Sequence, residues 1–227
     1  MKQQQQSNIN FFANLGASCY VIKGRNGDLL IDTGFYFTWK KLQKWLSNYQ
    51  IKHVFLTHAH ADHDWNAARM QQNGAQILLH IDDKNLRQAF SAQPVSAIFP
   101  KEKVRVAIQK IGTCFLKSTP YEPEIYIKNE DTAVLKTLGY DAEIVMLPGH
   151  TLGSMGVLHH DVLYCGDAFT MIHNCPEIAP TGVSIQKMRN SLQKILNINP
   201  AWLACGHGAP VRMREARPVI EAFLHEE

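Results

Sequence analysis

The apolar positions near the start of the chain fall into short blocks separated by turn-forming residues. Residues 9–13 and 17–23 are apolar and rich in β-formers, and the turn-type residues 25–28 precede a third apolar block at 29–31. Short apolar blocks bounded by glycine, asparagine and aspartate are typical of β-strands joined by tight turns. The pattern therefore predicts three consecutive strands that form a meander.

Three later segments have the apolar spacing of amphipathic helices. The first helix is predicted to end near Asn48, and its apolar positions are Trp39, Leu42, Trp45 and Leu46. The second is predicted to start after the N-cap Ser184 and to end at an Asn-Pro break at 199–200; its apolar face comprises Ile185, Met188, Leu192, Ile195 and Leu196. A last helix is predicted to open at Pro218, since proline is accepted in a first turn.

Five more short apolar blocks predict strands, and four of them are followed, after one or two residues, by a histidine or aspartate that is a candidate metal ligand. These four blocks are residues 53–56, 144–147, 162–165 and 202–205, and the fifth block is 77–79. Together with the helices they predict an α/β fold in which strands and helices alternate around a sheet-rich core.

The segment from about residue 82 to 143 has the weakest pattern, because prolines at 94, 100, 120 and 123 interrupt it repeatedly. Within it Val104, Ile108, Ile111 and Phe115 recur at helical spacing among several lysines. A solvated basic helix face is favoured there over an anion-binding lid.

Composition is that of an ordinary globular protein. The 227 residues are 45% hydrophobic and 19% charged, which favours one domain over residues 9–227 after a frayed, glutamine-rich start at 1–8. The formal net charge is only +3, with no interleaved basic and aromatic run, so a nucleic-acid partner is not expected. The oligomeric state stays open.

The chain carries no sign of export or membrane insertion. It shows neither a signal peptide nor an apolar stretch of membrane-spanning length. Its five cysteines are odd in number and contain no Cys-x-x-Cys pair, so neither a disulfide framework nor a zinc ribbon is indicated. We expect a cytoplasmic protein without a membrane partner.

The segment Thr-His-Ala-His-Ala-Asp-His at 57–63 concentrates metal-binding residue types at the end of a predicted strand. His58 and His60 are two positions apart, so both side chains can point the same way where the chain leaves the strand. Asp62 and His63 follow as the chain turns into a helix. Imidazole nitrogens and carboxylate oxygens are ligands of zinc, so one loop could serve two adjacent ions.

Three further candidate ligands each follow a glycine at a predicted strand end: His150, Asp167 and His207. A pair of ions about 3.5–4 Å apart needs a shared ligand and histidines from elsewhere in the fold, which these residues would supply. The chain has eleven histidines, and a lone histidine is more often structural. Four residues of ligand type lie within six positions, and three more each follow a glycine. Together they favour a metal centre over coincidence.

With these residues the chain resembles the metallo-β-lactamase fold superfamily, whose mark is HxHxDH followed by a histidine, a bridging aspartate and a last histidine. The resemblance covers about residues 16–210 and includes Leu-Ile-Asp-Thr-Gly at 30–34 and Pro-Gly-His-Thr-Leu-Gly-Ser at 148–154. It implies a four-layer αββα sandwich with the metals at one edge.

The resemblance also implies a role for each motif residue. His58, His60 and His150 would hold the first metal, Asp62, His63 and His207 the second, and Asp167 would bridge them. The implied cofactor is two zinc ions per chain, with iron and manganese as alternatives, and Asp62 and Asp167 count as catalytic through the metals. Asp32 would orient the metal loop through hydrogen bonds.

Other residues have no matching role. Trp65 stands where the family commonly has glycine, and a buried helix aromatic is favoured there over a pocket wall. Six histidines have no counterpart in the family motif and are interpreted as structural: His53, His80, His159, His160, His173 and His225. Among them, His173 is the strongest candidate for a functional role.

Within the superfamily, the pair Asp62-His63 points toward the glyoxalase II-like, lactonase and phosphodiesterase branches and away from true β-lactamases. The glycine-, cysteine- and arginine-bearing loop of glyoxalase II is missing after Asp167, the chain ends soon after His207, and Thr170 replaces the tyrosine of many lactonases. We expect a dinuclear, zinc-dependent hydrolase of a small ester, thioester or lactone. The alternatives are a persulfide dioxygenase-like oxidoreductase with one iron held by His58, His150 and Asp167, and a metal-binding protein without catalysis.

Overall fold

The computed structural model describes residues 9–13, 16–86, 96–99, 103, 104, 107 and 119–225 of the chain. The predicted helix around 104–115 and the predicted frayed start at 1–8 lie outside these residues, apart from isolated positions. Among the helices described, none is both long and apolar enough to cross a membrane.

The first sheet has six strands in the order β1-β2-β3-β4-β5-β7. Strands β1 to β3 form the predicted antiparallel meander, and β3, β4, β5 and β7 run parallel to one another. The strands are β1 (Asn10–Phe12), β2 (Cys19–Ile22), β3 (Asp28–Ile31), β4 (Ile51–Phe55), β5 (Gln76–His80) and β7 (Ile125–Ile127).

The second sheet has five strands in the order β15-β14-β10-β9-β8. Strands β10 and β14 are parallel, and the other pairs are antiparallel, so β8, β10 and β14 share one direction. The strands are β8 (Glu143–Met146), β9 (Met155–His159), β10 (Val162–Gly166), β14 (Trp202–Cys205) and β15 (Val211–Arg212).

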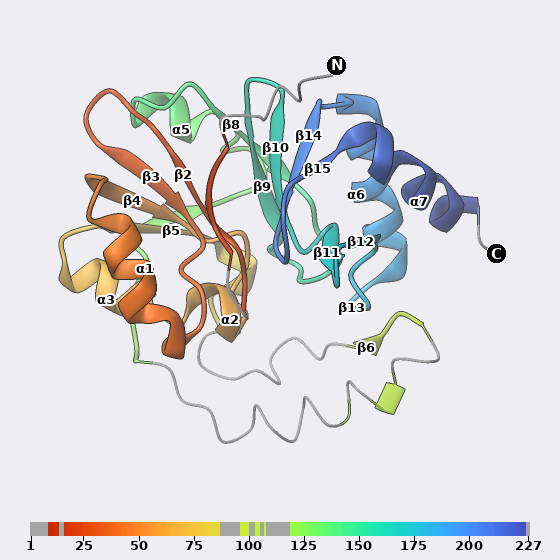
Figure 1. Cartoon of the computed structure of the whole chain (residues 1–227), viewed down its shortest axis with the longest axis horizontal. Helices are drawn as coiled ribbons and strands as arrows, with labels where there is room; N and C mark the ends of the chain where they lie inside the picture. The colour runs from red at the N-terminus through yellow and green to blue at the C-terminus, as the bar shows by residue number, and fades with distance from the viewer. Residues whose placement is uncertain are drawn as a thin grey trace, which may run out of the picture.

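Helices cover the outer face of each sheet, and two short strand pairs lie beside the second sheet (Figure 1). The helices are α1 (Trp39–Leu46), α2 (Ala61–Asp64), α3 (Ala67–Gln72), α5 (Val134–Thr137), α6 (Ile185–Ile198) and α7 (Met213–His225), with 3-10 turns η1 (Tyr36–Thr38) and η2 (Ile81–Asp83). The short pairs are β11 (Thr170–Ile172) with β12 (Cys175–Glu177), and β13 (Thr181–Gly182) with β6 (Ser96–Ala97).

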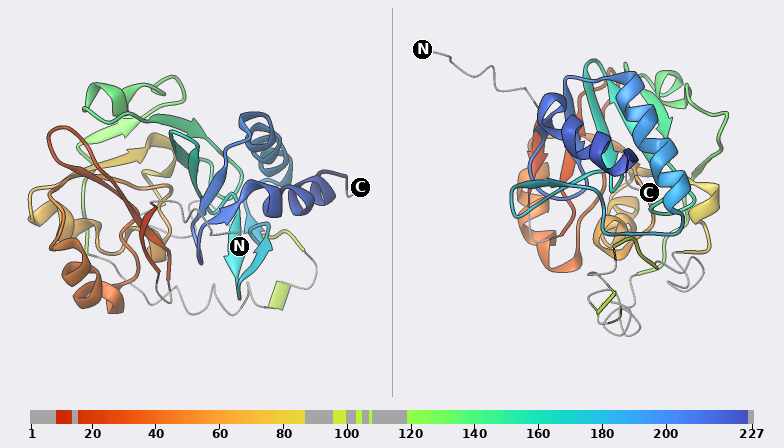
Figure 2. Two further views of the ribbon diagram at one scale, coloured as in Figure 1. Left: turned by 45° about the horizontal axis from the view of Figure 1, so that its top comes forward. Right: turned by 90° about the vertical axis from the view of Figure 1, so that its right-hand side faces the viewer.

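Side chains along each buried strand point alternately to the two faces of its sheet, and this alternation produces the layers of the sandwich. In β2, Tyr20 packs between the two sheets, whereas Val21 packs against α1 and α3 on the outer face. In β10, Tyr164 packs between the sheets, whereas Leu163 packs against α6 and α7. Successive strand residues point to opposite faces, so a sheet buried on both sides needs apolar residues at every position. The result is the predicted helix–sheet–sheet–helix sandwich, visible from two directions in Figure 2.

The candidate ligands lie just after strand ends that share one edge of the sandwich. The parallel strands of the first sheet end at this edge, and so do β8, β10 and β14 of the second. Backbone hydrogen bonds join the sheets there: Met155 N donates to Thr57 O at 2.9 Å, and Ser18 N donates to Gly206 O at 2.7 Å.

The last helix departs from the sequence prediction. It begins at Met213, not at Pro218, which lies inside it. The buried side chains of Met213 and Ala216 pack into the core beneath α7, and Met213 N donates to Ala201 O at 3.0 Å. These tertiary contacts offset the hydrogen bond that Pro218 cannot donate.

Candidate metal centre

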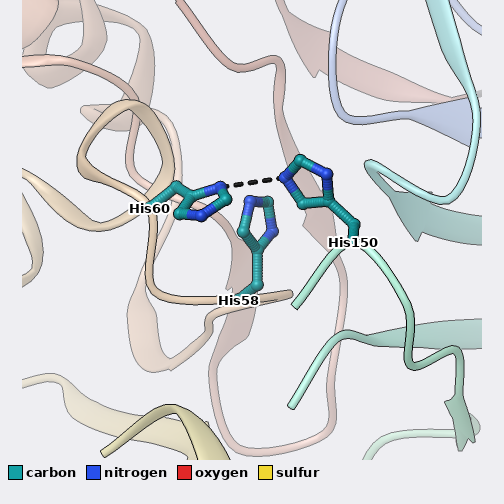
Figure 3. Close-up of side chains that lie close together, drawn as sticks. All are labelled: His58, His60 and His150. Carbon is teal, nitrogen blue, oxygen red and sulfur yellow. Dashed lines mark hydrogen bonds between the residues drawn. The ribbon is translucent and has the colours of Figure 1, made fainter. Parts of the chain in front are cut away.

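Three histidines from two distant segments form the first group at this edge. The loop after β4 supplies His58 and His60, and the loop after β8 supplies His150. One ring nitrogen of each lies within 4.8 Å of the others, and all three side chains are buried. His150 Nε2 and His60 Nδ1 face each other at 2.9 Å, with the His58 ring beside them (Figure 3).

A second group lies beside the first and comprises Asp62, His63 and His207, with ligand atoms again within 4.8 Å of one another. Helix α2 carries Asp62 and His63, and the turn after β14 carries His207. His207 Nε2 is 3.4 Å from Asp62 Oδ2, and these two side chains are 26% and 37% exposed. This group therefore borders the solvent, and we call it the outer group. We call the first group, which lies deeper, the deep group.

Asp167, just after β10, lies between the two groups. Its Oδ2 is 3.4 Å from Nε2 of both His150 and His207, and its Oδ1 is 3.4 Å from His63 Nε2. One carboxylate thus faces a histidine of the deep group and two of the outer group. The structure brings all seven predicted residues together, and Asp167 occupies the place expected of a bridging ligand.

Hydrogen bonds to one ring nitrogen orient three of the histidines. His63 Nδ1 lies 2.8 Å from Asp32 Oδ2, and His150 Nδ1 lies 2.8 Å from the Thr181 carbonyl oxygen. His58 Nδ1 lies 3.0 Å from Thr57 Oγ1, which donates to Asp32 Oδ2 at 2.9 Å. We assign the ring proton to Nδ1 in each case, because these acceptors require it. In the neutral form that binds metal, the Nε2 lone pair of each ring then points into the site.

Several of these inward atoms fit a metal better than they fit any protein partner. His58 Nε2, His63 Nε2 and Asp167 Oδ1 are fully buried and have no hydrogen-bond partner among the described residues. Leaving a buried polar atom without a partner costs about 1–3 kcal/mol, so three in one place call for an explanation. Coordination of divalent cations would satisfy all of them, and their mix of imidazole and carboxylate suits zinc-type metals.

Burial and neighbouring charges decide the protonation of the deep group. Burial lowers the pKa of His60 to about 3 and, helped by the neighbouring histidines, holds the pKa of His58 well below its ordinary value. Both rings are therefore neutral at pH 7, the form that binds metal.

The outer group carries paired charges. Burial alone would lower the pKa of His63 and His207, but the carboxylates outweigh it: Asp32 and Asp167 raise the pKa of His63 well above its usual value, and Asp167 raises the pKa of His207 to about 9. Burial opposes ionisation of Asp167, yet His207 and His63 hold its pKa well below the ordinary value. In the metal-free chain, protons on the two histidines balance the carboxylates.

Asp32 makes the hydrogen bonds expected of it. Besides its contacts with His63 and the Thr57 hydroxyl, its Oδ1 accepts from Thr57 N at 2.8 Å. Its backbone φ is 57°, a left-handed conformation unusual for a residue other than glycine. The surrounding bonds hold this strained conformation, which often marks a functional site.

The glycines before the ligands are needed for two different reasons. Gly149 and Gly166 have φ of +140° and +51°, so the chain turns there in a conformation that side chains disfavour. Gly206 has no such backbone, but a Cβ on it would overlap the Asp167 carboxylate. Close approach of the β14 turn to Asp167 therefore excludes any larger residue.

Residues outside the motif lie away from these groups. His173 is exposed at the turn between β11 and β12, where it and Asn174 have φ of 52° and 61°, and it belongs to none of the ligand clusters found among the described residues. Trp65 is half-buried in a turn, whereas the sequence predicts a buried helix aromatic. Its ring centroid lies 4.9 Å from that of Phe35 and 5.2 Å from that of Tyr36.

The cysteines that the structure describes are all free thiols, as the sequence indicated. Cys19, Cys165 and Cys205 are buried, and Cys175 is exposed. Burial raises the pKa of the Cys19 and Cys205 thiols, which disfavours the reactive thiolate. Cys19, Cys165 and Cys205 therefore serve as core residues.

Sequence reasoning missed some supporting residues of the site. The Thr181 carbonyl that orients His150 carries no side-chain signal, so no pattern could have found it. Asp83 lies in the weakly patterned segment after β5, yet its carboxylate accepts hydrogen bonds from Ala59 N and Thr151 Oγ1 in the two ligand loops. An aspartate just past a strand end was its only signal.

Comparisons with known proteins agree with this geometry. The family described as the metallo-beta-lactamase superfamily matches residues 14–207 of the chain. A probable metallo-hydrolase of Methanocaldococcus jannaschii is 29% identical over 199 residues, which cover 85% of this chain and 87% of that protein. A hydroxyacylglutathione hydrolase of Haemophilus influenzae is 28% identical over 119 residues, 52% of this chain and 49% of that protein.

Solved structures share the fold at lower identity. The crystal structure of a metallo-beta-lactamase family protein from Thermus thermophilus superposes with a TM-score of 0.68 at 17% identity, covering 95% of this chain and 77% of the other. Similarity at this identity bears on the architecture of the two sheets and their helices alone.

Proposed function

The chain belongs to the metallo-beta-lactamase superfamily and is a metal-dependent hydrolase, and from this premise we propose that it uses two zinc ions to hydrolyse a small ester, thioester or lactone. The observation that carries the proposal is Asp167, which lies 3.4 Å from histidines of both ligand groups. A carboxylate between two sets of ligands is the arrangement that paired metals need.

Each residue of the site has a role in this proposal. His58, His60 and His150 would hold the deep ion, Asp62, His63 and His207 the outer one, and Asp167 both. When bound, two such metal ions would lower the pKa of a coordinated water to near neutrality and polarise a carbonyl oxygen. No protein nucleophile is then required.

The chain's own residues prepare these ligands. Asp32 orients His63 directly and His58 through Thr57, and the Thr181 carbonyl orients His150. Asp62, whose side chain is 37% exposed, lies on the solvent-facing side of the outer group. Hydrolysis then adds one water across the acyl bond: an ester or thioester yields an acid together with an alcohol or a thiol, and a lactone opens to a single hydroxy acid.

The substrate class rests on this chemistry and on the relatives. Because the Haemophilus influenzae relative is named a hydroxyacylglutathione hydrolase, a glutathione thioester belongs in the substrate panel. We propose a small-molecule substrate and no nucleic-acid partner.

The decisive experiment is elemental analysis of the purified protein, followed by assay of the same sample on esters, thioesters and lactones. We expect about two zinc per chain, loss of activity on chelation and recovery with added zinc. In Asp167→Asn the metal content should fall and kcat should drop at least ~100-fold, in line with loss of a metal ligand. Asp141→Asn, which changes an exposed carboxylate in the same half of the molecule, serves as the matched control.

Two outcomes would overturn the proposal. Full activity after complete removal of metal would exclude metal-dependent hydrolysis. One iron per chain, with oxygen consumption in the presence of a persulfide, would instead favour the oxidoreductase alternative.

A further inference from the structure

Asp83, at the end of η2, is a buried carboxylate that does not belong to the ligand set. It is 0% exposed. Its Oδ2 accepts hydrogen bonds from Ala59 N at 3.1 Å and Thr151 Oγ1 at 2.8 Å, and its Oδ1 accepts from Gly153 N at 2.9 Å. Such donors suit a buried carboxylate, because a charge away from water must be compensated by hydrogen bonds.

The donors belong to the two loops that carry the deep histidines. Ala59 lies between His58 and His60, and Thr151 follows His150. One side chain therefore connects both sources of the deep ligand group.

The contact with the second loop is close. A Cβ on Gly153 would come within 2.7 Å of Asp83 Oδ1 and 2.8 Å of its Cγ. Real Cβ atoms essentially never approach so closely, so the glycine lets the loop backbone reach the carboxylate. Thr151 is further held by Ser154, whose Oγ lies 2.8 Å from Thr151 Oγ1 and accepts from Thr151 N at 2.9 Å.

The placement of Asp83 parallels that of Asp32. Strands β3, β4 and β5 are parallel neighbours, so the metal loop after β4 lies between the end of β3, with Asp32, and the end of β5, with Asp83. Asp32 holds the loop at Thr57 and His63, whereas Asp83 holds it at Ala59. Buried carboxylates thus fix the loop from both sides.

We propose that Asp83 is a positioning residue for the metal centre, which sets the distance between the loop of His58 and His60 and the loop of His150. This inference rests on the proposed function, since it assigns Asp83 a part in holding the deep ion. Loss of the carboxylate should loosen the ligand geometry and not merely weaken the fold.

The test compares Asp83→Asn with Asp82→Asn, a matched change of an exposed carboxylate one residue away on the same turn. An amide has only one acceptor atom, so at least one of the three donors would face an NH₂ group. We expect zinc affinity at one site, measured by competition with a chromophoric chelator, to fall ~10–100-fold. Asp82→Asn should match the wild type.

Thermal unfolding with and without zinc separates positioning from a purely structural role. Positioning predicts that the zinc-induced rise in Tm is smaller in Asp83→Asn than in the wild type. An equal fall in Tm with and without zinc, at unchanged zinc affinity, would overturn the inference.

A milder pair keeps the test valid if Asp83→Asn fails to fold. Thr151→Val removes one donor at nearly constant volume, and Thr151→Ser keeps the hydroxyl. We expect weaker zinc binding in Thr151→Val and wild-type binding in Thr151→Ser; equal binding in both would overturn the inference. Wild-type protein that binds no metal would instead refute the proposed function, so the two failures are distinguishable.

Discussion

His207 and His63 hold protons at pH 7 in the metal-free chain, since nearby carboxylates raise their pKa, to about 9 for His207. A metal needs the free base, so zinc binding at pH 7 should release up to about two protons per chain. Below pH 9 a proton competes with zinc at His207, and apparent zinc affinity should therefore rise as pH rises from 6 to 9. Titration calorimetry in buffers of different ionisation enthalpy measures this release.

His207→Gln is the informative variant, because it should release about one proton fewer at pH 7 than the wild type does. Zinc binding without any proton release at pH 7 would contradict the charge balance derived for the outer group.

Helix α6 starts next to the loop of His150, and Ser184 caps it. Ser184 Oγ accepts from Lys187 N at 3.3 Å, while Val183 N donates to Gly149 O at 2.8 Å. Ser184→Ala should lower the free energy of unfolding by about 1 kcal/mol, the usual effect of losing an N-cap acceptor. Urea denaturation measures the change.

Ser184→Thr retains the capping oxygen and should stay near wild-type stability. Ser47→Ala, at an exposed serine just after α1, should change stability by less than about 0.5 kcal/mol. A loss as large in Ser47→Ala as in Ser184→Ala would contradict the assignment of the cap.

The packing of the two sheets against each other makes the whole molecule sensitive to alkali through Tyr164. This residue is 3% exposed, its ring lies 5.2 Å from that of Tyr20, and burial raises its pKa to about 12. The folded state thus keeps the proton longer than the unfolded state, so stability is complete below pH 10 and is lost as pH rises toward 12. Between pH 9 and 11 this residue should account for a loss of about 1.3 kcal/mol.

Tyr164→Phe should lose correspondingly less stability over that pH range than the wild type, as measured by urea denaturation at both pH values. Tyr36→Phe, which changes an exposed tyrosine, should lose as much as the wild type. The same loss in all three proteins would show that Tyr164 does not drive the alkaline transition.

The ligand types and their places at strand ends could be predicted from the sequence, because both depend on short-range patterns. His58, His60, Asp62 and His63 lie within six residues. Strand periodicity and the glycines before His150, Asp167 and His207 were local signals as well. The meander, α1 and α6, including its cap and its break, followed from the same rules of spacing and capping.

Only the tertiary structure decided which groups support the site and where some elements begin. Asp83 bonds to Thr151, 68 positions away in the chain, and the Thr181 carbonyl orients His150 from 31 positions away. Helix α7 begins at Met213 because that side chain packs into the core, although Pro218 suggested a later start. These features depend on which distant atoms folding brings together, and local patterns contain no record of such contacts.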